Sequence, residues 1–144
     1  MDPVTDAIAP LQTSTHRETR KILLLEDQQI VRDYLVLALG SKSYTVTAVE
    51  NGVEGIREIQ ANDFDVILCD MMMPKLAGDM FYFAVERMKP QLCKRFIFMT
   101  GFKNDTRIHT FIKKVNGLIL GKPFKVDELM EMISFLQVRA HLDG

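Results

Sequence analysis

Four short apolar runs in this chain each end in polar or charged residues, and this repeated pattern constrains the fold more than any other feature. The runs and the residues that follow them are 22–25 with Glu26 and Asp27, 64–69 with Asp70, 96–99 with Thr100, and 118–120 with Gly121 and Lys122. Buried parallel strands are nearly continuous in apolar residues, and an open parallel sheet binds its ligands beyond the carboxyl ends of its strands. The pattern therefore predicts a parallel α/β sheet with its polar residues gathered along one edge.

Helix-forming segments separate these strands, and a fifth strand is expected at 45–49, a segment rich in β-branched residues. The expected helices are 28–39, 52–60, 78–88, 105–115 and 126–138. In the first of these helices the residues expected on the buried face are Ile30, Val31, Tyr34, Leu35 and Ala38. Five strands alternating with five helices predict right-handed crossovers and a sheet covered on both faces.

Residues 1–20 differ from the rest of the chain, because their prolines and their Thr/Ser-rich stretch show no sustained periodicity. We expect them to form a flexible leader or linker. Residues 21–140 are expected to form one domain, which at this length can bury a sizeable core. Residues 141–144 are expected to be a tail.

Composition excludes several classes of function. The net charge of −1 and the lack of a Lys/Arg cluster argue against binding to nucleic acid or to an anionic membrane. The N-terminus carries Asp2 and Asp6 where a signal peptide has positive charge, and no apolar stretch approaches the roughly 18 residues of a membrane helix. We therefore expect a cytoplasmic protein, with no zinc site among its scattered histidines and no disulfide between Cys69 and Cys93.

The acidic residues predict a cation site. Asp27 could instead cap the following helix, but capping would leave the adjacent Glu26 unexplained. With Asp70 at a neighbouring strand end, three carboxylates would repel one another unless a cation lies among them. Oxygen ligands favour a hard ion, Mg²⁺ first, with Mn²⁺ as a substitute.

Lys122 and Thr100 are candidates for contact with a phosphoryl group at the same edge. Lys122 could simply be a surface lysine, and Thr100 could simply satisfy a backbone group. Their placement at strand ends favours the functional interpretation, since an ammonium can pair with a phosphoryl oxygen as a point charge. The run 71–73 is expected to be a loop of core-facing methionines, and any metal ligand from it would be a backbone carbonyl, because a thioether is too soft for Mg²⁺.

Residues 21–139 resemble a response-regulator receiver domain, the phospho-accepting module of two-component signalling. The motifs that carry the resemblance are Leu25-Glu26-Asp27, Ala48 with Asn51-Gly52-Val53-Glu54, Asp70-Met71-Met72-Met73-Pro74 with Gly78, Thr100-Gly101 and Lys122-Pro123-Phe124. The spacings of 30 residues from Asp70 to Thr100 and of 22 from Thr100 to Lys122 are also those of the family. The resemblance implies a flavodoxin-like, doubly wound α/β fold: a five-stranded parallel sheet of order 2-1-3-4-5 with helices on both faces.

The resemblance also implies a chemistry and a set of partners. Asp70 would accept a phosphoryl group from a phosphohistidine on a sensor histidine kinase or a histidine phosphotransfer protein. Glu26, Asp27, Asp70 and the Met72 carbonyl would hold Mg²⁺, and Lys122 and Thr100 would contact the phosphoryl group. Such a chain is a signalling receiver that catalyses only its own phosphorylation and dephosphorylation, either standing alone or as the receiver part of a hybrid kinase.

A downstream protein would bind the face formed by 105–115, 118–120 and 126–138, and the chain would be a monomer or weak dimer. The sequence departs from the family at Ile119, where Tyr or Phe is common, and at Gly101, where Ala is common. Two alternatives are a receiver that only binds proteins and a metal-dependent aspartyl-phosphate hydrolase. The hydrolase needs an Asp two residues after its nucleophile, where this chain has Met72. A dinucleotide-binding fold needs a glycine-rich turn where residues 26–28 stand.

Overall fold

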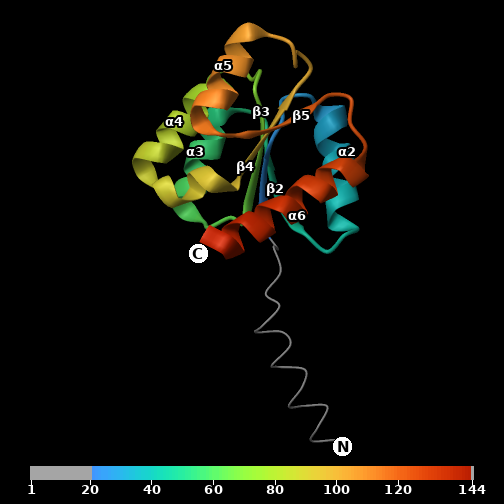
Figure 1. The fold of residues 1–144 in the computed structure, drawn as a ribbon. Coiled ribbons are helices and arrows are strands. Elements are labelled where there is room, and N and C mark those ends of the chain that lie inside the picture. The colour runs from blue at the N-terminus through green and yellow to red at the C-terminus, as the bar shows by residue number, and fades with distance from the viewer. Residues whose placement is uncertain (1–20, 144) are drawn as a thin grey trace, which may run out of the picture.

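A five-stranded sheet forms the centre of the molecule, which we describe from a computed structural model covering residues 21–143 (Figure 1). The strands are β1 (Lys21–Leu25), β2 (Thr45–Val49), β3 (Val66–Asp70), β4 (Phe96–Thr100) and β5 (Leu118–Gly121). They lie in the order β2-β1-β3-β4-β5, and every neighbouring pair is parallel. The predicted α/β fold and strand order are confirmed, whereas the expected leader, residues 1–20, lies outside the described part of the chain.

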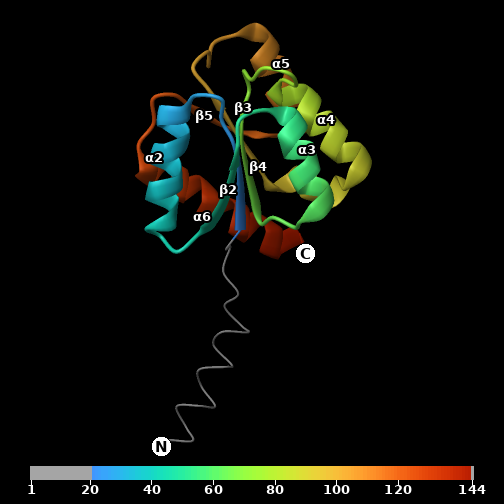
Figure 2. The same cartoon turned by 180° about the vertical axis from the view of Figure 1, so that it is seen from behind.

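Helices cover both faces of the sheet, as predicted. They are α2 (Gln29–Gly40), α3 (Gly52–Ala61), α4 (Gly78–Met88), α5 (Thr106–Val115) and α6 (Val126–Asp143). Figures 1 and 2 show α3, α4 and α5 on one face and α2 and α6 on the other. Within residues 21–143 no helix combines the length and the apolarity that crossing a membrane requires.

Alternating side chains along the buried strands build two different cores. In β1, Leu23 and Leu25 join the core beneath α3, α4 and α5, while Ile22 and Leu24 join the core beneath α2 and α6. This is the period of two expected of a strand. The first core is rich in aromatic residues: Phe81, Tyr82, Phe96, Phe98 and Phe111. The buried residues of the second core include no aromatic side chain, and its aromatic residues, Tyr44 and Phe124, are only partly buried.

Most element boundaries lie within a residue of those predicted, and the larger differences concern β3, the segment before β4 and α6. Strand β3 begins at Val66 rather than at residue 64, and just before it the Asp65 carboxylate accepts the backbone N–H of Lys21 at 2.9 Å. A short 3₁₀ helix, η1 (Pro90–Arg95), precedes β4 with Pro90 in its first turn. Helix α6 runs to Asp143, five residues beyond the predicted end at 138 and through residues assigned to a tail.

The buried face predicted for α2 is wrong in part. Ile30 is 85% exposed and Tyr34 is 57% exposed, whereas Leu35 and Leu39 are buried against the sheet. The apolar residues of this helix surround most of its circumference, so periodicity alone could not select the face that packs. The outward residues instead form an apolar stripe, which we define as Ile30, Tyr34 and Leu37.

Candidate functional site

Three carboxylates meet at the carboxyl edge of the sheet. Glu26 and Asp27 follow β1, and Asp70 ends β3, the strand beside it. One carboxylate oxygen from each residue lies within 4.8 Å of those of the other two. Glu26 is fully buried and Asp70 is 5% exposed, while Asp27 faces solvent. The structure thus brings together the three acids singled out in the sequence.

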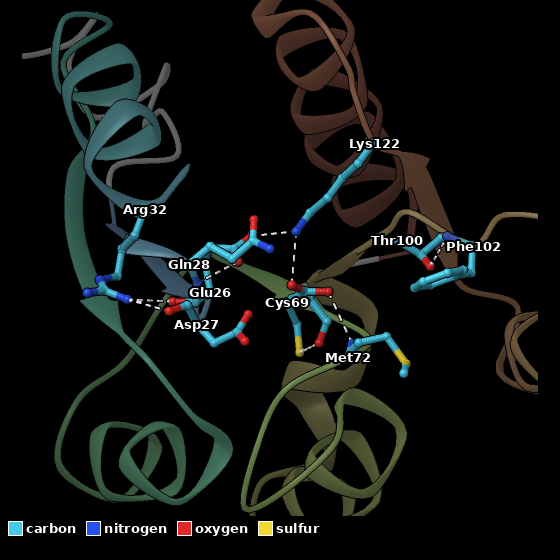
Figure 3. A network of polar contacts seen from close by, with 10 residues as sticks. Glu26, Asp27, Gln28, Arg32, Cys69, Met72, Thr100, Phe102 and Lys122 are labelled. Atoms are coloured by element: carbon cyan, nitrogen blue, oxygen red, sulfur yellow. Dashed lines mark hydrogen bonds and ion pairs between the residues drawn. The ribbon is translucent and has the colours of Figure 1, made fainter. Parts of the chain in front are cut away.

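Lys122 bridges two of these acids. Its Nζ donates to Glu26 Oε1 at 2.6 Å and to Asp70 Oδ2 at 2.9 Å. The residue follows β5, and its backbone N–H donates to the carbonyl of Thr100 at 2.7 Å. This hydrogen bond fixes the backbone of Lys122 at the carboxyl edge of the sheet. Figure 3 shows its side chain reaching across from β5 toward Glu26. The simpler interpretation of Lys122 as an ordinary surface lysine is therefore wrong.

Burial and charge act against each other at this edge. Burial raises the pKa of the Glu26 carboxyl, although hydrogen bonds from Lys122 and from the Gln28 backbone offset part of the rise. Burial alone would lower the pKa of Lys122, but its hydrogen bonds to Glu26 and Asp70 outweigh that effect, so its pKa lies above the ordinary value. The ammonium therefore stays charged near neutral pH.

The loop after β3 fits closely against the start of α4. A Cβ added at Gly78 would lie 2.7 Å from the Asp70 carbonyl oxygen, so no larger residue fits there without a shift. The backbone N–H of Met72 donates to Asp70 Oδ1 at 3.1 Å. Met71 and Met73 are buried, as expected of core-facing methionines, but the Met72 side chain is 52% exposed. The predicted metal role of the Met72 carbonyl stays a prediction.

Thr100 is the one predicted site residue whose side chain is turned elsewhere. It is fully buried, and its hydroxyl oxygen accepts the backbone N–H of Phe102 at 2.9 Å. In Figure 3 the two residues lie together, apart from Glu26 and Asp27. This hydrogen bond is the backbone-satisfying role that sequence analysis set beside the functional one.

The capping explanation for Asp27 is wrong. Helix α2 begins at Gln29 with Gln28 in the N-cap position, and no side chain caps it. The Gln28 backbone N–H donates instead to Glu26 Oε2 at 3.0 Å. Neither Glu26 nor Asp27 is therefore explained as a cap of α2, and both carboxylates belong to the cluster at the edge of the sheet.

Sequence reasoning missed Arg32. Its Nη1 donates to the carbonyl oxygens of Glu26, at 2.9 Å, and Asp27, at 3.3 Å. A signal was present: a cation in the first turn of a helix lies at the end where the helix dipole disfavours positive charge. Its position one helical turn into α2, the helix that follows the acid pair, could have marked it.

These donors fit a hard divalent cation. The Lys122 ammonium pairs with two of the three clustered carboxylates, Glu26 and Asp70, which leaves an excess of negative charge at the edge. Carboxylate oxygens are ligands that Mg²⁺ and Mn²⁺ accept, whereas a soft or thiolate-binding metal would find no suitable donor in this set.

Comparison with known proteins assigns the family. The family model described as the response regulator receiver domain matches residues 22–134. This chain belongs to that family. Receiver domains are the signalling domains of two-component systems, and the match spans the sheet, the acidic edge and the first half of α6.

Relatives of this receiver differ in how much of their length it covers. It is 29% identical over 121 residues to the response regulator receiver protein CpdR of Brucella abortus, covering 84% of this chain and 99% of CpdR. It is 31% identical over 110 residues to the sensor kinase CckA of the same organism, covering 75% of this chain but 11% of CckA. Among solved structures, the chemotaxis protein CheY4 of Vibrio cholerae matches with a TM-score of 0.73 and 26% identity, over 82% of this chain and 98% of CheY4. Receivers thus occur both as whole proteins and as small parts of kinases.

Proposed function

We propose that this receiver takes a phosphoryl group onto Asp70 in a Mg²⁺-dependent reaction. The observation that carries the proposal is the placement of the Asp70 carboxylate, which lies between two further carboxylates and a shared ammonium at an otherwise apolar sheet. Phosphoryl transfer depends on positioning and charge neutralisation, and this edge supplies groups for both.

Each residue has a distinct part in the proposal. Glu26, Asp27 and Asp70, with the Met72 carbonyl, would hold Mg²⁺, which when bound neutralises charge on the phosphoryl oxygens. Mn²⁺ would substitute for it. An Asp70 carboxylate oxygen attacks phosphorus while the phosphorus–nitrogen bond of a phosphohistidine breaks, leaving its electron pair on the imidazole nitrogen. Lys122 contacts a phosphoryl oxygen of the resulting acyl phosphate, and Thr100 contacts another after turning from Phe102.

The donor would be a sensor histidine kinase or a histidine phosphotransfer protein. The apolar stripe of Ile30, Tyr34 and Leu37 supports this part of the proposal, because α2 starts immediately after the acid pair and the stripe begins beside the edge. An exposed apolar surface of this kind is typical of a protein contact. A downstream protein would use the separate face of α5, β5 and α6, where Phe135 and Val138 are exposed. With such partners, the reaction would take place in the cytoplasm.

Intact mass measurement tests the reaction. The full chain is incubated with a small phosphodonor with and without Mg²⁺, alongside Asp70→Asn and a control, Asp63→Asn, whose side chain is 76% exposed in an ion pair with Arg95. We expect one phosphoryl group on the wild type and on the control with Mg²⁺, and none on Asp70→Asn or without the metal.

The outcomes separate the alternatives. Equal labelling of Asp70→Asn would refute the assignment of Asp70. A folded wild type that takes no phosphoryl group would favour a receiver that only binds proteins. Continuous release of phosphate without a trapped adduct would favour the hydrolase.

A further inference from the structure

Arg32 joins the backbone carbonyls of two consecutive acids. It is the fourth residue of α2, and its side chain turns back toward the loop that leaves β1 (Figure 3). A single nitrogen, Nη1, donates to the carbonyl oxygen of Glu26 and to that of Asp27. The guanidinium therefore binds the loop through its main chain rather than through its carboxylates.

The geometry of the loop shows why such a bridge matters. Consecutive side chains and consecutive carbonyls of an extended strand point in opposite directions. The sheet ladder still includes Glu26, whose N–H donates to the Val49 carbonyl at 3.1 Å. Just after it, the carbonyls of Glu26 and Asp27 converge on one donor, and both carboxylates reach the same site as Asp70. The chain therefore leaves the extended conformation at Glu26 and Asp27, the two residues whose carbonyls Arg32 contacts.

The position of this arginine has no advantage for the helix itself. A cation near a helix N-terminus opposes the helix dipole, and α2 contains no other basic residue. The half-buried side chain must also be ordered to make its two hydrogen bonds. The hydrogen bonds from Arg32 to the carbonyls of Glu26 and Asp27 offset these costs.

We propose that Arg32 is a positioning residue for the cation site, holding the Glu26–Asp27 peptide so that both carboxylates face Asp70. The identity of the cation as Mg²⁺ rests on the proposed function, but the bridge itself does not. Groups that orient metal ligands without touching the metal commonly contribute about 10- to 100-fold in affinity.

Charge and positioning predict opposite effects when Arg32 is removed. If its positive charge dominated, its loss would strengthen the binding of a cation to the acids. If its bridge dominates, the loss would loosen two of the three ligands and weaken binding. The Arg32 side chain is only half-buried, so solvent and salt screen its charge and we expect the bridge to dominate.

The test is Mg²⁺ binding to the full chain by calorimetry, without a phosphodonor. Arg32→Met keeps the aliphatic stem and removes both the donors and the charge, and Arg32→Lys keeps a donor and the charge. The matched control is Arg57→Met, which removes the same charge from an exposed position on α3, across the sheet. We expect the Mg²⁺ dissociation constant to rise about 10- to 100-fold in Arg32→Met, to rise less in Arg32→Lys and to stay unchanged in the control.

Equal or tighter Mg²⁺ binding by a folded Arg32→Met protein, or the same loss in Arg57→Met, would overturn the proposal. If Arg32→Met does not fold, Arg32→Gln takes its place under the same criterion. Phosphorylation gives an independent readout: the Mg²⁺ concentration for half-maximal rate should rise in Arg32→Met, while the rate at saturating Mg²⁺ changes little. Because the calorimetric result needs no phosphoryl transfer, failure of the proposed function and failure of the bridge are distinguishable.

Discussion

The interior of the sheet and its carboxyl edge are both buried, but they bury opposite kinds of side chain. In the interior, residues such as Leu24, Ile67 and Phe98 have no exposed surface and contact other apolar groups. At the edge, Glu26 and Asp70 are nearly as buried, yet they are carboxyl groups, and both pair with the single ammonium of Lys122. Burial of apolar surface stabilises the interior, whereas burial of charged groups at the edge costs free energy of desolvation. Removing an interior side chain should therefore lower stability, whereas removing an edge charge should raise it.

Phe98→Ala should have the largest effect. Phe98 is fully buried, stacks on Phe96 at 5.1 Å between ring centroids and meets Phe111 edge-on at 5.2 Å. We expect the free energy of unfolding, measured in urea, to fall by about 3–5 kcal/mol. The control is Phe135→Ala on α6, where the ring is 52% exposed, with an expected loss below about 1 kcal/mol. Similar losses at both positions would contradict the contrast.

The edge should also control the lifetime of the phosphoryl group. Met72 and Phe102 are expected to flank the phosphoryl group, and their apolar side chains, 52% and 60% exposed, offer nothing to orient an attacking water. Slow loss of phosphate is expected, and Met72→Asn with Phe102→Glu should speed it by about tenfold or more, measured by intact mass over time. Met80→Asn on α4 serves as the control. Unchanged or slower loss in the double variant would refute this prediction.

The structural response to phosphorylation should begin at the edge and reach the aromatic core through α5. The Thr100 hydroxyl accepts the Phe102 N–H, so a movement of Thr100 toward a phosphoryl group would be felt in the loop that Phe102 begins. Ile119 packs against the aromatic core but is β-branched and stiff, so it cannot swing a ring between buried and exposed positions. With a beryllofluoride mimic and Mg²⁺, amide exchange should change mainly at residues 100–115 and should not change in Asp70→Asn. A dominant change at 118–120 would contradict this view.

The smallest expected effect is a titration in the interior. Burial, with a further contribution from Cys93, raises the pKa of Tyr82 from its usual 10 to about 12. The folded state therefore keeps this proton between pH 10 and 12 while the unfolded state loses it, so the group lowers stability as pH rises through that range. Absorbance titration should show a tyrosine component near pH 12 that Tyr82→Phe lacks. An unchanged titration in that variant would show that Tyr82 is not its source.

The comparison also explains what the sequence could predict. Strand positions and the meeting of Glu26, Asp27 and Asp70 followed from continuous apolar runs, because topology alone brings the ends of adjacent parallel strands together. The packed face of α2 did not follow, since its apolar residues allow more than one orientation. The turned hydroxyl of Thr100 and the bridge from Arg32 depend on backbone groups in loops, whose directions no periodicity encodes. The roles of the site residues in phosphoryl transfer stay predictions.

Asp70 offers the most direct test of the idea that edge charges oppose folding until a cation binds. The measurement is the melting temperature of the wild type and of Asp70→Asn, each with and without Mg²⁺, with Asp63→Asn as the control. Without metal, Asp70→Asn should melt about 2–4 °C higher than the wild type. With saturating Mg²⁺ the wild type should gain more than the variant, because binding stabilises the folded state by mass action. A lower melting temperature for metal-free Asp70→Asn would contradict this expectation and show that the bond between Asp70 and Lys122 is required for folding.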